Sequence, residues 1–173
     1  MAEIKSTIDL IMERTKNLSA SPQEREAFHR QERERHLRSL VQKLLDCSLS
    51  IDDVKDEMER EKKSGREAEA KEHMKSALAG HVDPESNNDR LLRLIHELVG
   101  TAEEKLRETV LSCREEFGTW KNGVMQSRMK ELEAKGIAGS AVLPNPEADP
   151  RWKARREELQ ADCAKRLLTA ISG

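Results

Sequence analysis

The sequence contains few apolar residues and no long apolar run. Hydrophobic residues occupy 36% of its 173 positions, whereas globular domains usually hold about 45–50% apolar residues with glycine included. A helix that spans a membrane needs about 20 consecutive apolar residues, and the runs in this chain are only a few residues long. No transmembrane segment and no secretory signal are therefore expected. The shortage of apolar residues favours a small core distributed along helices over a compact globule.

The sequence also has no large excess of positive or negative charge. Thirty-one basic residues stand against thirty-three acidic ones, for a net charge of −2. Proteins that bind nucleic acid usually have a basic excess or a one-sided basic patch, so a nucleic-acid partner is not expected. The exception is the Arg-rich 25–38 arm, although acidic residues are interleaved with its basic ones. Its arginines are Arg25, Arg30, Arg33, Arg35 and Arg38, and they keep an RNA- or ribosome-associated factor as the alternative function.

Cysteine is scarce. Cys47, Cys113 and Cys163 are an odd number and do not have the spacing of metal ligands. Disulfide frameworks are typical of small secreted proteins, whereas thiols in the cytoplasm stay reduced. The three residues are therefore predicted to be free thiols, and the chain is predicted to be cytoplasmic.

Catalytic signatures are lacking as well. The chain has no Gly-x-Ser-x-Gly nucleophile motif and no Gly-rich phosphate loop. A di-iron site would need the Glu-x-x-His pattern on two helices, and this pattern occurs once, from Glu26 to His29. His29 and His36 share a helical face but are expected to be solvated. No catalytic residue, cofactor or metal ligand is therefore assigned, and a metal-binding bundle enzyme is kept only as a minor alternative.

Helical periodicity is what the chain does have. Apolar residues recur every three or four positions from Leu91 to Leu132, as on one face of a long helix. This stripe predicts a long central helix over residues 87–135, in which Gly100, Gly118 and Gly123 mark places for a kink or a close helix crossing. A last helix is predicted over residues 150–173. The stripe contains Leu91, Ile95, Leu98, Ala102, Leu106, Val110, Cys113, Phe117, Trp120 and Val124, and the inner face of the last helix contains Trp152, Leu159, Cys163, Leu167 and Ala170.

Aromatic residues are rare, with two phenylalanines, two tryptophans and no tyrosine. Phe117 and Trp120 share the long stripe, and Trp152 lies near the start of the last helix. Aromatic side chains bury large apolar areas. These three residues are predicted to form a local core where the last helix crosses the long one, with a ligand pocket as the alternative.

The rest of the chain divides into shorter helical segments. N-terminal helices are predicted over residues 1–48, the first over 3–18 and the second from a capping box at Ser21. Mixed charges and the lack of aromatic residues argue against membrane-surface binding by the first helix. A charged helical arm is predicted over residues 49–82, from a cap at Ser50. It is expected to be solvated between Glu59 and His73 and to pack again at Met74, Ala77 and Leu78. The fold expected is all-α: one domain over 1–173, an elongated antiparallel hairpin or bundle of about five helices with coiled-coil-like packing. The narrow stripe is compatible with a homodimer that buries it.

The most distinctive segment is an uncharged loop. Within the predicted 136–149 connection, residues 136–146 contain no charged side chain, and two prolines forbid helix there. Its apolar side chains either fold back against the helices or present an extended segment to a protein partner. The candidate partner-binding residues are Ile137, Ala141, Val142, Leu143 and Pro144. The function predicted first is therefore a non-enzymatic helical scaffold or adaptor that acts through protein–protein contacts with an unknown partner.

Overall fold

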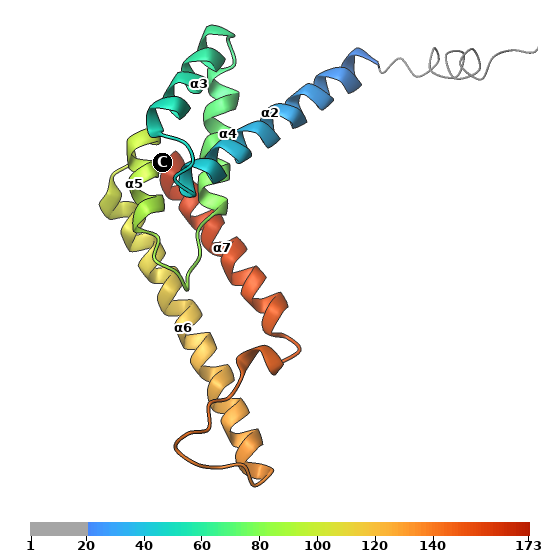
Figure 1. The fold of residues 1–173 in the computed structure, drawn as a ribbon, viewed down its shortest axis with the longest axis vertical. Helices are drawn as coiled ribbons and strands as arrows, with labels where there is room; N and C mark the ends of the chain where they lie inside the picture. Colours follow the sequence, from blue (N-terminus) through green and yellow to red (C-terminus); the bar gives the residue numbers. More distant parts are fainter. Residues whose placement is uncertain (1–20) are drawn as a thin grey trace, which may run out of the picture. The chain divides into compact units, whose positions relative to one another are not determined.

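The computed structural model describes residues 21–173, and the chain divides into two units, Met1–His36 and Leu37–Gly173. The described residues form six α-helices and one short 3-10 helix and contain no β-strand (Figure 1). The all-α prediction is confirmed, and the single domain expected over residues 1–173 stays a prediction. The helix predicted at 3–18 lies outside the described residues. The elements are α2 (Pro22–Leu45), α3 (Ile51–Lys63), α4 (Glu67–Gly80), α5 (Asp89–Val99), α6 (Glu103–Ala134), η1 (Pro146–Ala148) and α7 (Trp152–Ser172).

Two helices begin at the serine caps that the sequence predicts, and both caps are capping boxes. The Ser21 hydroxyl accepts a hydrogen bond of 3.2 Å from the Glu24 amide, while the Ser21 amide donates one of 2.7 Å to the Glu24 carboxylate. Ser50 and Asp53 form the same pair of bonds at the start of α3, at 3.2 and 3.0 Å. Hydrogen bonds from the hydroxyl and then the amide of Ser50 lower the pKa of Asp53. Both caps satisfy amides that the first turn of a helix leaves free.

The predicted 87–135 helix is divided in two, and this is a correction. Helix α5 ends at Gly100, which has a φ of +85°, and α6 begins only at Glu103. A left-handed glycine is a common helix end, and the chain then folds back, so that Arg107 of α6 forms an ion pair of 3.0 Å with Asp89 at the start of α5. The two halves of the stripe therefore lie on two neighbouring helices instead of one continuous face.

Gly100 and Gly118 make a matched test of this turn. Alanine at Gly100 is expected to lower the free energy of unfolding by about 1 kcal/mol, because side chains disfavour a positive φ. Alanine at Gly118, inside α6, is expected to raise it by up to about 1 kcal/mol. No atom lies within 4 Å of an added Cβ at either position. The two substitutions should therefore differ in their effect on stability only because the backbone conformations of the two glycines differ. Urea unfolding of both variants measures the difference, and a continuous helix through Gly100 would make both substitutions stabilising.

The main core of the second unit draws on five of its helices and the second half of α2. Leu44 of α2, Leu78 of α4, Ile95 of α5, Leu106 of α6 and Leu167 of α7 are all at most 1% exposed. They belong to one cluster that also contains Val54 of α3. The burial of Leu37, Leu40, Val41 and Leu44 confirms that α2 packs through its second half. None of the helices in the described part of the chain is long and apolar enough to cross a membrane.

The predicted charged arm is a hairpin of two helices. Gly65, with a φ of +74°, separates α3 from α4. Met74, Ala77 and Leu78 of α4 are buried, as predicted, and Ala70, which is 3% exposed, is buried within the stretch predicted to be solvated. Alanine is small enough to let the two helices approach, which explains how a segment with few large apolar residues can still pack.

A disulfide joins α6 to α7, contrary to prediction. Cys113 and Cys163 are bonded, with their Cα atoms 5.7 Å apart, inside the usual range for disulfides. The prediction of free thiols is wrong for these two residues, because it considered only sequence spacing, whereas the pair forms where two apolar helix faces meet. Cys47 is free and exposed. The prediction of a cytoplasmic location relied on reduced thiols and stays a prediction without that support.

The loop between α4 and α5 is held between α6 and α7. Val82 in this loop is fully buried, and its carbonyl accepts a 3.2 Å hydrogen bond from Gln160 of α7. The carboxylate of Glu85 binds both Lys121 of α6, at 2.7 Å, and Arg156 of α7, at 3.2 Å. Buried Asn88 closes the loop through hydrogen bonds to backbone atoms of residues 83 and 86. The loop thus ties the two longest helices of this unit together.

Candidate functional site

The uncharged loop is fixed at both ends. Gly136, with a φ of +76°, ends α6, and the Ile137 amide donates a 3.0 Å hydrogen bond back to the Leu132 carbonyl. This is the bond pattern of a Schellman motif. At the other end, the Asn145 side chain accepts a 3.0 Å hydrogen bond from the Glu147 amide and begins η1. The residues between these two anchors form no regular secondary structure.

The predicted partner-binding residues do not share one environment. Pro144 is buried and Val142 is half-buried, as expected for a loop that folds back. Leu143, between them, is 85% exposed, and Ile137 is 48% exposed. Ala141 is exposed as well. The loop therefore rests on the protein through two residues while it presents Leu143, the most exposed large apolar side chain of the described residues, to solvent.

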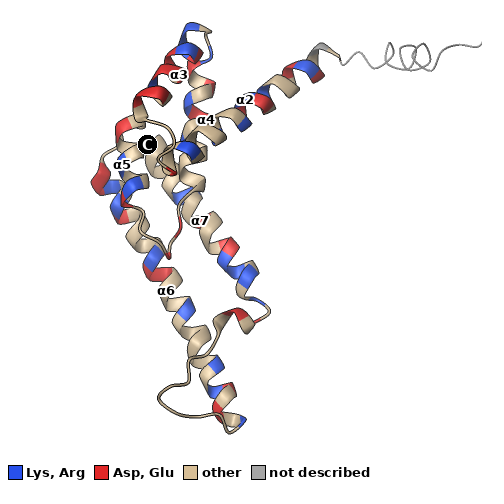
Figure 2. Ribbon diagram, in the orientation of Figure 1, with Lys and Arg blue, Asp and Glu red and all other residues tan. Residues whose placement is uncertain are grey.

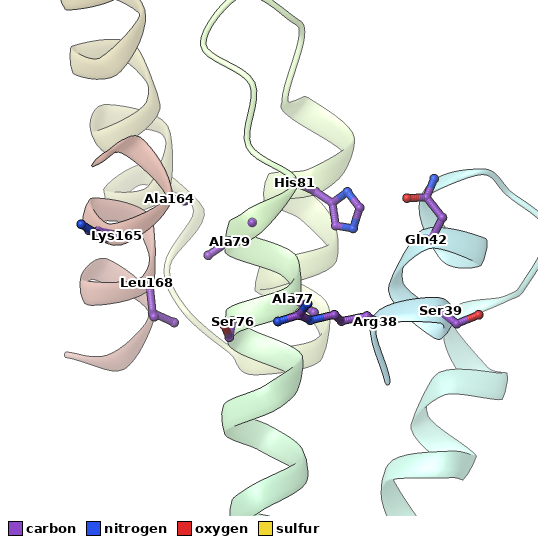
Figure 3. A pocket seen from close by; sticks show the side chains of 11 residues that line it. Arg38, Ser39, Gln42, Ser76, Ala77, Ala79, His81, Ala164, Lys165 and Leu168 are labelled. Carbon is purple, nitrogen blue, oxygen red and sulfur yellow. The ribbon is translucent and has the colours of Figure 1, made fainter. Parts of the chain in front are cut away.

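A groove, which the sequence does not predict, lies between α2, α4 and α7 (Figure 3). Its volume is about 660 Å³, within the range of ligand-binding sites. Arg38 and Gln42 come from α2, Lys165 and Leu168 from α7, and His81 from the residue after α4. Alanines of α4 and α7 line the space between them. Ser39 and Ser76 line it as well, so the groove has small apolar and polar side chains in its middle and one cation on each of two flanking helices.

The electrostatics of this groove differ from those of the chain as a whole. No aspartate or glutamate lines it within the described part of the chain. Asp46, directly after α2, contacts one of the lining residues, because it accepts hydrogen bonds of 3.0 and 2.9 Å from Gln42. Partial burial lowers the pKa of His81, and Asp46 opposes that shift, so the environment of the groove favours the neutral imidazole. The positive charge of the groove therefore comes from Arg38 and Lys165.

The three aromatic residues form a second small core. Phe117 meets Trp120 and Trp152 edge-on, with ring centroids 5.5 and 6.2 Å apart. The two tryptophans stack, with centroids 4.5 Å apart. Together with Leu159 they confirm the local core predicted where the last helix crosses α6. Beside Trp120 lies a shallow pocket of about 430 Å³ whose charged residues have both signs.

The Arg-rich 25–38 arm carries charges of both signs. It lies within α2, where Lys and Arg alternate with Asp and Glu along the ribbon (Figure 2). His29 is 3.5 Å from Glu32, a neighbour on the same helix. Among residues 21–173, no group of three or more side chains of the metal-binding types comes together.

No protein-family model, curated protein or solved structure matches this chain. The class of protein is therefore defined by the fold and the two surfaces alone. It is an all-α protein of helical hairpins, with an exposed leucine on an anchored loop and a groove edged by cations.

Proposed function

We propose that the chain is a non-enzymatic scaffold or adaptor, and that the loop over residues 137–146 binds a protein partner with Leu143 as its anchor. The single observation that carries this proposal is the contrast between Leu143, which is 85% exposed, and the buried Pro144 beside it. An apolar side chain held in solvent by a fixed backbone loses little conformational freedom on binding. Apolar anchors of this kind contribute strongly to interfaces when a partner provides a pocket.

The absence of charge in the loop supports the same proposal. A partner that covers residues 137–143 would desolvate no ionised side chain, and charged groups are depleted in the centre of protein interfaces. Groove docking fits the exposed leucine better than strand addition, because the loop turns between Gly139 and Val142, where the Val142 amide donates a 3.1 Å hydrogen bond to the Gly139 carbonyl.

The experiment is affinity purification from the native cell with the wild-type chain and the Leu143→Asp variant. The variant should keep the wild-type melting temperature, because Leu143 makes little contact with its own protein. It should lose the partner, because a carboxylate would be desolvated in an apolar pocket. Quantitative mass spectrometry of the bound proteins measures the loss.

Ser140→Asp is the matched control, since it adds the same charge at an exposed position of the same loop. It should retain the partner. A lower melting temperature for Leu143→Asp would contradict the proposal by showing that Leu143 serves the fold. Equal recovery of every bound protein with both variants would contradict it too.

RNA or ribosome association through the Arg-rich 25–38 arm remains the alternative. The interleaved acids cancel much of its charge, so no structural observation favours it over the loop. Gel-shift binding that weakens steeply with salt would support it, and no binding at low salt would remove it. A homodimer also remains a prediction, which light scattering coupled to size exclusion tests directly.

A further inference from the structure

The groove between α2, α4 and α7 suggests a second partner of different chemistry. We propose that it binds an acidic amphipathic helix of a partner protein, with carboxylates paired to Arg38 and Lys165 and apolar side chains against Leu168 and the alanines. This goes beyond the loop proposal, because it assigns a separate surface. A chain with both surfaces could hold two partners at once, which is what an adaptor does.

The first observation behind this proposal is that Lys165 has a charge but no acidic partner in the described chain. Several basic side chains of this protein pair with an acid one helical turn away, along α3, α4 and α6. Lys165 forms no ion pair with any residue of the described chain. Its neighbour Asp162, three residues earlier, is bound to Arg166 at 2.6 Å. An acidic ligand would therefore gain this contact without breaking an existing one.

The second observation behind this proposal is the arrangement of the two cations and the apolar side chains in the groove. Arg38 lies on the α2 side and Lys165 on the α7 side of the groove; Figure 3 shows the Arg38 side chain extending from α2 toward α4 and the Lys165 side chain at the outer edge of α7. Ser76, Ala77 and Ala79 of α4 line the groove between them, and Ala164 and Leu168 line it from α7. Small side chains let another helix approach closely, and a helix in a groove contacts it through residues three or four apart. Acids flanking that apolar face would meet the two cations.

Other anionic ligands fit less well. No aromatic side chain lines the groove in the described structure, so nothing there would stack on bases as nucleic-acid sites do. Two full positive charges are few for binding a phosphate backbone. The groove is also open to solvent, whereas sites for small molecules usually enclose most of the ligand. A protein helix with both charge and apolar surface matches all of these features.

The test is a display selection with the full chain as target. The probe is a library of random peptides of about four helical turns. The wild-type chain is the positive target, and a double variant, Arg38→Glu with Lys165→Glu, is the counter-target. The selection should enrich sequences with acids flanking apolar residues at helical spacing. Purified peptides should bind the double variant at least about tenfold more weakly than wild type by fluorescence anisotropy, as expected for reversal of interface charges.

The control variant is Lys63→Glu with Lys130→Glu, which makes the same change in net charge at two exposed positions outside the groove. It should bind the peptides like wild type, and so should Leu143→Asp, whose loop is a separate site. Arg38 and Lys165 are exposed, so the double variant should show the wild-type thermal melt by circular dichroism.

Three results would overturn the inference. One is the absence of any acid-rich enrichment, and another is equal peptide binding by wild type and the double variant. The third is a result in which single-stranded RNA or ATP binds the wild-type chain but not the double variant, while no acidic peptide binds the wild-type chain. That pattern would assign the groove to phosphate groups. None of these results bears on the loop, so failure here and failure of the proposed function are distinguishable.

Discussion

Joint replacement of Cys113 and Cys163 by alanine is expected to lower the free energy of unfolding by about 4 kcal/mol. The disulfide joins residues 50 apart in the sequence, and a cross-link over a loop of this length strongly restricts the unfolded chain. The two sulfur atoms also belong to the core, since Cys113 is 5% and Cys163 1% exposed. Urea unfolding at constant temperature, with and without a reductant, measures the loss.

Reduction of the wild-type chain separates the two contributions. It removes the cross-link but leaves both sulfur atoms in place, so it should cause most of the loss, while the alanines add the cost of lost packing. Cys47→Ala is the control and should change little, because Cys47 is exposed and free. A thiol titration of the unfolded, unreduced protein should count one thiol. A count of three, together with no effect of reductant, would contradict the disulfide.

Local signals in the sequence predict the helix ends well. The boxes at Ser21 and Ser50 and the glycine end at Gly136 depend only on residues within one turn, so sequence alone can identify them. Burial is predicted equally well on α7, whose five inner-face residues are all at most 8% exposed. Helical spacing determines which residues share a face, and the more apolar face is buried against neighbouring helices.

The fold-back at Gly100 is harder to predict, because the apolar spacing continues across it. Leu98 and Leu106 would lie on one face of a continuous helix, and they pack against the same core after the chain reverses. A glycine inside a helical pattern is compatible with both outcomes. Tertiary contacts such as the ion pair between Arg107 and Asp89 accompany the reversal, and no local pattern reveals them.

Contacts between distant segments account for the other differences. The disulfide had an indirect signal, since the stripes of the two helices place Cys113 one turn from Phe117 and Cys163 one turn from Leu159, and these aromatic and apolar residues form one cluster. The sequence contains no signal for the groove, because the lining residues come from three helices and have no common spacing. In the loop, composition indicated the segment but could not indicate that Leu143 faces solvent while Pro144 is buried.

Leu106→Ala is expected to cost about 2–5 kcal/mol of unfolding free energy, the range for a leucine removed from a packed core. Leu106 is fully buried in the main cluster, and the neighbours of a fully enclosed side chain can fill the resulting cavity only in part. Leu111→Ala is the matched control on the same helix. Leu111 is 50% exposed, so its replacement should change the free energy by no more than about 0.5 kcal/mol.

The same pair of variants distinguishes a core from a dimer seam. Leu106 is buried by its own chain, so the cost of Leu106→Ala should not depend on protein concentration. If a second copy covered this face instead, unfolding would be coupled to dissociation, and the midpoint would rise with protein concentration. Urea unfolding of wild type and Leu106→Ala over about a hundredfold range of protein concentration distinguishes a core within one chain from a dimer interface. Unfolding midpoints that do not change with protein concentration would show that one chain buries the stripe by itself. A large loss of unfolding free energy for Leu106→Ala, with almost none for Leu111→Ala, would show that the stripe is part of the core.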